Sequence, residues 1–264
     1  MEQKEHDLVS VIMPSYNAAG LIKRTIESVV AQSYKNWELL VIDDCSSDNT
    51  RDVVTMLARS DSRIRLVSLS KNNGAPAAPR NIGIRKAKGE WIAFLDADDI
   101  WHPRKLSLQL EMMRTIGVEF SCTQMCDFTH EDEIFFCDTS RILVEEIDFN
   151  KQRLRARIPT SSVVASRDLL LKVPFNEDPR YKAVEDYHCW LRVHQEIIKS
   201  IKLKCQLLYY RKVPGQISGS KKYMLGRVYM VHKEYHDGSF AKAVFYTVTH
   251  SLGGFYFRIL KKGL

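Results

Sequence analysis

The first hundred residues predict an α/β fold in which helices cover both faces of a mostly parallel sheet. Short apolar runs rich in β-branched residues alternate with stretches of helical periodicity, giving strand–helix–strand–helix–strand–helix–strand. This alternation is typical of parallel strands joined by right-handed crossovers. Polar residues follow each predicted strand, and such sheets bind ligands at the carboxyl ends of their strands. The sequence therefore predicts a ligand site at one edge of the sheet.

Each element in this half has its own signal. Leu21, Ile22, Ile26, Val29 and Val30 share one face of the first predicted helix, and Thr50 or Asn49 is expected to cap the second. The predicted strands are LVSVIM (8–13), WELLVID (37–43), IRLVSLS (64–70) and EWIAFLD (90–96). The predicted helices cover 21–33, 51–60 and 80–89.

The remaining chain is less regular. Strands are expected at 118–128, 131–138 and 201–213, and helices at 103–117 and 181–197, while 153–173 reads as a strand running into a helix. A stretch rich in Gly, Ser and Lys marks a boundary near 215–220. We therefore expect a catalytic domain over 1–215 and a basic, aromatic, helical C-terminal extension over 216–264.

Composition limits the class of protein. The chain has 264 residues, 45% of them hydrophobic, a net charge of +7 and a pI of about 9.0. This supports a sizeable core and a partner that is nucleic acid, an anionic membrane surface or a phosphorylated substrate. Dispersed Lys and Arg argue against nucleic acid. The N-terminus lacks a signal-peptide core and no apolar run reaches about 20 residues, so a cytoplasmic location is expected.

The six cysteines form no CxxC pair. Cys122 and Cys126 resemble half of a zinc site, but no second pair of ligands follows at finger-like spacing. Reduced, mostly buried thiols are the expected state of these residues.

Three acids crowd the end of the fourth predicted strand, in FLDADDIW (94–101). Asp96 and Asp98, spaced D-x-D, can turn toward one point, and a divalent cation there would cancel their repulsion. Oxygen ligands suit Mg²⁺ or Mn²⁺, and a site with few carboxylates completes its ligand set with water and substrate phosphates. The alternative is a helix N-cap formed by Asp98 or Asp99.

Other strand ends carry complementary groups. Asp43 and Asp44 follow the second strand, where acids accept hydrogen bonds from a base or a ribose, unless they only stabilise the turn. Arg80 is expected to open a helix, where the dipole favours anions, and Lys71 lies on the loop before it. The chain has neither a GxGxxG nor a GxxxxGK[ST] motif, which argues against dinucleotide and P-loop folds.

A second acidic pair, Glu185 and Asp186, lies at the start of a predicted helix. A carboxylate placed there can act as a general base. It can equally be an acid that only balances the helix dipole.

Together these segments resemble a family of enzymes. VSVIMPSYN, SVVAQSY, NWELLVIDDCSSDNT, PRNIGIRKAKGEWIAFLDADDIW and EDYHCWLR are similar to the motifs of family 2 glycosyltransferases of the GT-A fold, of the bacterial surface-polysaccharide type. The resemblance covers residues 8 to about 195. It implies that Asp186 is the catalytic base, and that Asp96 and Asp98 hold the metal. The implied donor-binding residues are Pro14, Ser15, Tyr16, Asn17, Asp43, Asp44, Arg80, Asp96, Ala97 and Asp98.

The resemblance also implies a reaction. A hexose or N-acetylhexosamine would pass from a UDP-sugar to a hydroxyl of a saccharide acceptor, with inversion and with Mn²⁺ or Mg²⁺ as cofactor. Arg211, Ser218, Lys221 and Lys222 are further candidates for diphosphate contacts. The alternative activity is a nucleotidyltransferase acting on a sugar phosphate, but PSYNAAG (14–20) lacks the Gly-rich, Lys-containing loop expected there.

The C-terminal extension mixes aromatic and basic residues, among them Phe240, Phe245, Lys242 and Arg258. This mixture suits an anionic membrane interface, and would fit a polyprenyl-diphosphate-linked acceptor and a peripheral place on the inner face of the cell membrane. The alternative is an ordinary C-terminal helix packed on the domain.

Overall fold

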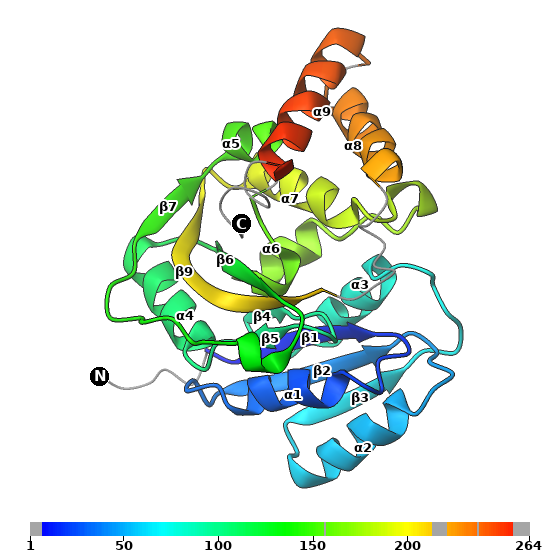
Figure 1. Cartoon of the computed structure of the whole chain (residues 1–264), viewed down its shortest axis with the longest axis vertical. Helices are drawn as coiled ribbons and strands as arrows, with labels where there is room; N and C mark the ends of the chain where they lie inside the picture. The colour runs from blue at the N-terminus through cyan, green and yellow to red at the C-terminus, as the bar shows by residue number, and fades with distance from the viewer. Residues whose placement is uncertain (1–6, 156, 213–220, 237, 256–264) are drawn as a thin grey trace.

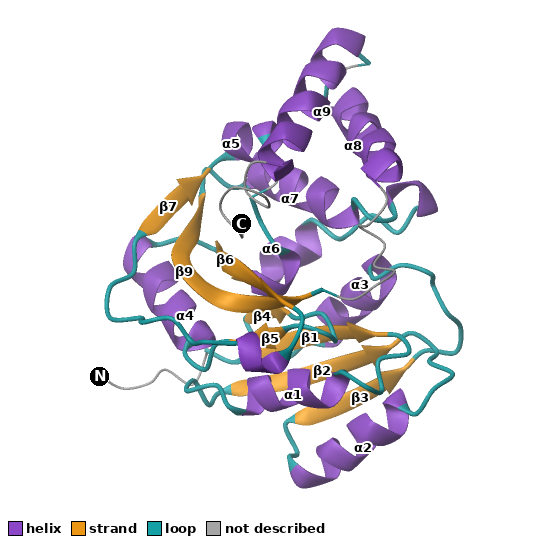
Figure 2. Cartoon of the chain, in the orientation of Figure 1, coloured by secondary structure: helices purple, strands orange, loops and turns teal. Residues whose placement is uncertain are grey.

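The computed structural model describes residues 7–155, 157–212, 221–236 and 238–255. Within these ranges the strands form one nine-stranded sheet of order β3-β2-β1-β4-β8-β6-β9-β5, with β7 paired to β9 (Figures 1 and 2). The predicted sheet, mostly parallel and covered by helices on both faces, is therefore confirmed.

The first four strands are parallel and fill the middle and one side of the sheet. They are β1 (Val9–Ser15), β2 (Trp37–Asp43), β3 (Ile64–Ser68) and β4 (Trp91–Phe94). β1 and β2 are buried along their whole length, as expected of strands covered on both faces. β1 continues through Pro14 because its pairing with β2 runs on to Ser15, opposite Asp43.

Two hydrophobic clusters cover the two faces of the sheet. One contains apolar side chains of α1 (Ile22–Val30), α2 (Thr50–Ser60) and α4 (Lys105–Ile116). The other contains side chains of α3 (Ala77–Lys86), α6 (Arg167–Lys172) and α7 (Glu185–Glu196). Trp190 and its neighbours on α7 belong to this second core.

The second half of the sheet is organised around one long strand, β9 (Ser200–Arg211). It runs parallel to β6 (Phe120–Phe128) and antiparallel to β7 (Val144–Ile147) and β5 (Ile100–Trp101). β8 (Val164–Ser166) joins β4 to β6, and α5 (Phe149–Leu154) follows β7.

Three local predictions are wrong. Residues 131–138 form a 3₁₀ turn at Glu131–Glu133 and no strand, because β6, β7 and β5 already occupy the edges of β9. Neither Asn49 nor Thr50 caps α2 with its side chain; Asp48 accepts a hydrogen bond from the Thr50 amide instead. α3 begins at Ala77 rather than Arg80, and Pro79 fits because first-turn amides have no intrahelical partner.

In the described part of the C-terminal extension are two helices, α8 (Lys221–Tyr235) and α9 (Phe240–Phe255), which lie at the end of the molecule opposite α2 (Figure 1). Val228 and Val231 of α8 are buried in a third cluster with Tyr181, Val184 and Leu191. At least α8 is therefore packed on the sheet domain. The described helices include none long and apolar enough to cross a membrane.

A buried histidine lies where α8 and α9 meet. His232 is fully buried, its Nε2 lies 3.2 Å from the Tyr187 hydroxyl, and its ring stacks on Tyr246. Burial, followed by the charges of His250, His236 and Arg153, lowers its pKa to about 3. Below about pH 6.5, the pKa of a histidine in the unfolded chain, His232 therefore binds a proton in the unfolded chain but not in the folded chain.

We expect stability to be complete above pH 6.5 and to be lost as the pH falls toward the folded pKa of His232. Thermal unfolding measured from pH 7.5 to pH 5 should show this fall, and it should be shallower for His232→Leu. His130→Leu, which replaces an exposed histidine, is the matched control and should follow the wild type. An identical slope for His232→Leu would show that this histidine is not a source of the acid sensitivity.

Candidate active site

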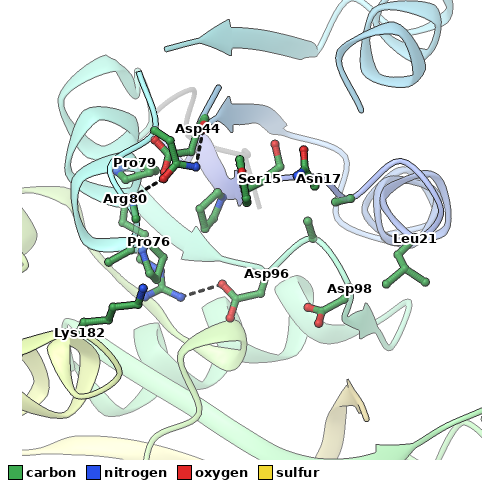
Figure 3. A pocket seen from close by; sticks show the side chains of 17 residues that line it. Ser15, Asn17, Leu21, Asp44, Pro76, Pro79, Arg80, Asp96, Asp98 and Lys182 are labelled. Atoms are coloured by element: carbon green, nitrogen blue, oxygen red, sulfur yellow. Dashed lines mark hydrogen bonds and ion pairs between the residues drawn. The ribbon is translucent and has the colours of Figure 1, made fainter. Parts of the chain in front are cut away.

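A cavity of about 640 Å³ opens at the carboxyl ends of β1 and β4 (Figure 3). The predicted residues that line it are Pro14, Ser15, Tyr16, Asn17, Asp44, Arg80, Asp96, Ala97 and Asp98. The structure thus brings together nine of the ten predicted donor-binding residues; the exception is Asp43. We call this space the donor cavity.

The loops after β1 and β2 hold each other in place. Asn17 adopts a left-handed conformation (φ 48°), and its side-chain oxygen accepts a hydrogen bond from the Ser47 amide at 2.9 Å. The Asn17 amide in turn donates to the Ser46 hydroxyl at 2.9 Å. Tyr16 remains 53% exposed beside this junction, so its ring is free to meet a flat ligand.

The two acids that end β2 have different roles. Asp43 is fully buried, accepts hydrogen bonds from the Ser46 amide and hydroxyl, and lies 3.4 Å from Arg51 Nε. Asp43 does not line the donor cavity, because successive side chains alternate in an extended strand, and its contact with a ligand stays a prediction. Asp44 lines the donor cavity and accepts from the Asn73 amide at 3.0 Å, which ties the loop after β3 to the site.

Arg80 is not the free cation at a helix start that the sequence predicts. It lies in the first turn of α3, its side chain is 4% exposed, and its guanidinium contacts Asp96 at 2.7 Å and Glu185 at 3.4 Å. The orientation of this side chain is therefore set by the two carboxylates and not by the helix dipole. Arg80 lines the donor cavity and links the end of β4 to the start of α7, and Figure 3 shows its contact with Asp96.

The D-x-D segment and the next acid occupy distinct environments. Asp98 is partly exposed and lines the donor cavity, and burial together with the charge of Asp96 raises its pKa to about 6. Asp99 is fully buried, and burial with the charges of Asp98 and Asp96 raises its pKa well above the usual range. Its Oδ1 accepts from the Arg211 amide at 3.1 Å, so Asp99 fixes β9 to the loop.

Asp186 lies in a second cavity of about 240 Å³, which we call the acceptor-side cavity. Its Oδ2 accepts a hydrogen bond from Thr160 Oγ1 at 3.0 Å, and its Oδ1 accepts from the Tyr187 amide at 2.6 Å. Burial raises the pKa of Asp186, and the nearby positive charge of Arg80 opposes that rise. Asp96 lines both cavities, so the two lie on either side of this residue.

Glu185, next to Asp186, points toward Arg80. It is 5% exposed, and burial followed by the charge of Asp186 raises its pKa to about 7. Glu185 therefore balances Arg80 in the interior, while Asp186 faces the acceptor-side cavity.

Several site residues were not predicted. Lys182 lines the donor cavity, and Thr160 orients Asp186. Met224 and Val228 of α8 and His250 of α9 line the acceptor-side cavity. Lys182 could have been predicted as a site residue, because it lies just before Glu185 in the sequence. No local sequence feature predicts that α8 and α9 approach the acceptor-side cavity.

The remaining basic candidates whose side chains the structure describes do not line the donor cavity. Lys71 is exposed and is not among the residues that line it. Arg211 lies behind the D-x-D loop, where its Nε donates to the Asp98 carbonyl at 2.9 Å and its guanidinium pairs with Glu131. Ser218 and the side chains of Lys221 and Lys222 lie outside the described residues.

Comparison with known proteins identifies relatives of the whole chain. Residues 10–170 match the family described as Glycosyl transferase family 2. The chain is 37% identical over 248 residues, 94% of this chain and 93% of the relative, to the UDP-Glc:α-D-GlcNAc-diphosphoundecaprenol β-1,3-glucosyltransferase WfgD of Escherichia coli. Other relatives carry the names of teichuronic acid and colanic acid biosynthesis glycosyltransferases of Bacillus subtilis and Escherichia coli.

Solved structures share the fold. TarS 1–349 of S. aureus, in complex with UDP-GlcNAc, superposes with a TM-score of 0.72 at 20% identity, covering 95% of this chain and 73% of that one. The mannosyltransferase PcManGT of Pyrobaculum calidifontis, in complex with GDP-Man and Mn²⁺, gives a TM-score of 0.68 at 18% identity, covering 97% and 71%. These likenesses confirm the predicted GT-A fold.

The buried ion pairs of Arg80 predict a large loss of stability when the cation is removed. Arg80→Met leaves Asp96, Glu185 and Asp186 without their shared counter-charge, and we expect the free energy of unfolding in urea to fall by about 3 kcal/mol. Adding Glu185→Gln should restore part of that loss, because it removes one of the uncompensated acids. Arg85→Met, on the exposed side of the same helix, should cost little. A loss as small for Arg80→Met as for Arg85→Met would contradict the assigned role.

Proposed function

This chain belongs to glycosyltransferase family 2, and from that premise we propose that it transfers a hexose or N-acetylhexosamine from a UDP-sugar to a saccharide hydroxyl. One observation carries the proposal: Asp96 lines both the donor cavity and the cavity of Asp186, so the two cavities are adjacent. A donor sugar held between the two cavities would have the UDP diphosphate on one side and Asp186, the general base, on the other.

The donor cavity suits a nucleoside diphosphate-sugar. Tyr16 offers an aromatic ring, and Asp44 offers carboxylate oxygens near the edge of a base or a ribose. Lys182 brings a positive charge to the same cavity, where it can contact a diphosphate. Arg80 is held by acids and serves to shape the wall rather than to bind phosphate directly.

The acids of the D-x-D segment fit Mg²⁺ or Mn²⁺ in part. Asp98 faces the donor cavity, whereas Asp96 already accepts a hydrogen bond from Arg80 at 2.7 Å. Among the described residues no group of three or more His, Cys, Asp or Glu side chains is arranged to hold a metal. Asp98, with Asp96, would therefore share the ion with the donor diphosphate and water, a ligand set typical of Mg²⁺ sites. When bound, such an ion offsets the negative charge of the UDP leaving group.

In this proposal Asp186 acts as the general base. Its hydrogen bonds from Thr160 and the Tyr187 amide fix the orientation of the carboxylate, and the positive charge of Arg80 opposes the rise in its pKa that burial causes. The acceptor hydroxyl would lose its proton to Asp186 as its oxygen attacks the anomeric carbon and UDP leaves from the opposite face. This one-step displacement inverts the anomeric configuration.

The acceptor is proposed to be a polyprenyl-diphosphate-linked saccharide of a bacterial surface polysaccharide, such as an O-antigen or a capsule. WfgD, by its name, acts on a diphosphoundecaprenol-linked sugar, and this chain matches it over almost its whole length. Work on such an acceptor would place the protein on the inner face of the cell membrane.

The proposed activity is tested by measuring UDP release from UDP-glucose, UDP-galactose, UDP-GlcNAc and UDP-GalNAc, with Mn²⁺ and a GlcNAc-diphosphate-lipid acceptor. We expect release from at least one donor to rise when the acceptor is added. No release from any of the four would contradict a UDP-sugar donor.

Asp186→Asn should lower the turnover number by about 10²–10⁴-fold, because the amide cannot accept the acceptor proton. UDP affinity, measured by calorimetry, should stay within about twofold, since Asp186 does not line the donor cavity. Asp132→Asn, at an exposed site, is the matched control. Turnover near the wild-type value in Asp186→Asn would remove this residue from the role.

Asp98→Asn should abolish the gain in UDP affinity that Mn²⁺ provides, because the amide lacks the charge that holds the cation. UDP titrations with Mn²⁺ and with EDTA would measure that gain for the wild type, for Asp98→Asn and for the Asp132→Asn control. An unchanged gain in the Asp98 variant would show that the metal is held elsewhere.

A further inference from the structure

α9 is apolar on the side that faces away from the protein. Its inner side is packed: Ala243 and Thr247 are buried, and Tyr246 stacks on His236 with ring centroids 4.5 Å apart. The opposite side carries large exposed side chains, which we call the outer face of α9. They are Phe240 (71% exposed), Val244 (37%), Phe245 (56%), Val248 (48%) and Leu252 (63%).

The spacing of these residues makes the outer face continuous. Phe240, Val244, Val248 and Leu252 are four residues apart, so they form one stripe along the helix. A surface helix of a globular protein normally presents polar residues on this side. A continuous exposed apolar stripe instead marks an interaction surface.

The sequence from the start of α9 onward is basic. From Phe240 to Leu264 the sequence has four Lys or Arg residues and neither Asp nor Glu. Beside the stripe is a cavity of about 470 Å³, whose lining includes Arg153, Lys242 and Phe245. The Arg153 guanidinium lies 4.9 Å from the centre of the Tyr246 ring, and its buried Nε hydrogen-bonds to no described group. This hollow offers positive charge next to apolar surface.

We propose that the outer face of α9 docks onto an anionic lipid bilayer, with Arg153 and Lys242 contacting headgroup phosphates. Apolar side chains flanked by cations are the combination that holds a helix in the plane of such an interface. A second copy of the chain is a poorer occupant, because a two-fold contact would bring the same basic residues against each other. The choice of a bilayer as the partner rests on the proposed lipid-linked acceptor. The apolar and basic character of the surface is observed independently of that proposal.

Docking in this way would bring the acceptor-side cavity close to lipid. His250 of α9 lines that cavity, while Phe245 and Leu252 of the same helix point outward. Only the width of one helix, about 10–12 Å with side chains, separates the two surfaces. A saccharide carried by a membrane lipid could therefore reach Asp186 while its lipid stays in the bilayer.

The test is flotation of the full chain with phosphatidylcholine vesicles that contain or lack phosphatidylglycerol. The wild type should float with the anionic vesicles, and Phe245→Ser/Leu252→Ser should lower the partition coefficient at least about tenfold. Met56→Ser/Ile198→Ser removes two exposed apolar side chains from other surfaces and should leave flotation unchanged. Lys242→Glu, a substitution at an exposed site, should weaken binding to anionic vesicles and reduce its dependence on salt.

Three outcomes would overturn the proposal: no flotation of the wild type, equal flotation of Phe245→Ser/Leu252→Ser, or a wild-type dimer that this variant converts to a monomer in light scattering. Circular dichroism and thermal unfolding confirm that each variant is folded. UDP release from a soluble acceptor without vesicles should be the same in all of these variants. Because flotation needs no UDP-sugar, failure of the bilayer proposal and failure of the proposed reaction give different results.

Discussion

The buried guanidinium of Arg80 joins the two halves of the site, and the positions of the other groups depend on it. Gly83, one turn along α3, lets the helix press against β1, since a Cβ there would lie 2.5 Å from Ile12 Cγ2. This close packing of α3 on β1 positions Arg80 so that its side chain contacts Asp96 at the end of β4 and Glu185 at the start of α7. Without the cation, carboxylates this close and this buried could not all be ionised. The arrangement of acids between the two cavities therefore depends on the positive charge of Arg80.

The acids around Arg80 differ in function because their surroundings differ. Asp99 has no exposed surface, burial raises its pKa strongly, and it holds the loop to β9 through the Arg211 amide. Asp98 keeps part of its surface in the donor cavity, and with a pKa of about 6 it is mostly ionised at neutral pH. Asp186 has hydrogen bonds that favour its ionised form. Separating the pKa values of neighbouring carboxyls by environment is a general way to divide acid, base and binding roles.

The sequence predicted most of the fold because the first four strands are short, apolar and separated by helices of clear periodicity. It also predicted the donor cavity, since residues that follow parallel strands meet at one edge by topology alone. It could not tell Asp43 from Asp44, a distinction that depends on which side chain the strand turns inward. Nor could it predict the burial of Arg80, which is set by Glu185, 105 residues away. The false strand at 131–138 arose because a local apolar pattern does not reveal that β6, β7 and β5 already pair with β9.

The two cavities also differ in which part of the chain builds them. Nearly all residues of the donor cavity fall within 10–170, the segment that matches the family, with Lys182 as the exception. The acceptor-side cavity instead takes Met224, Val228 and His250 from the C-terminal helices, beyond that segment. A nucleotide-sugar presents the same diphosphate to every member of such a family, whereas each acceptor has its own shape. In the proposed reaction, substitutions in α8 and α9 would alter the acceptor while Arg80 and the acids that it contacts stay in place.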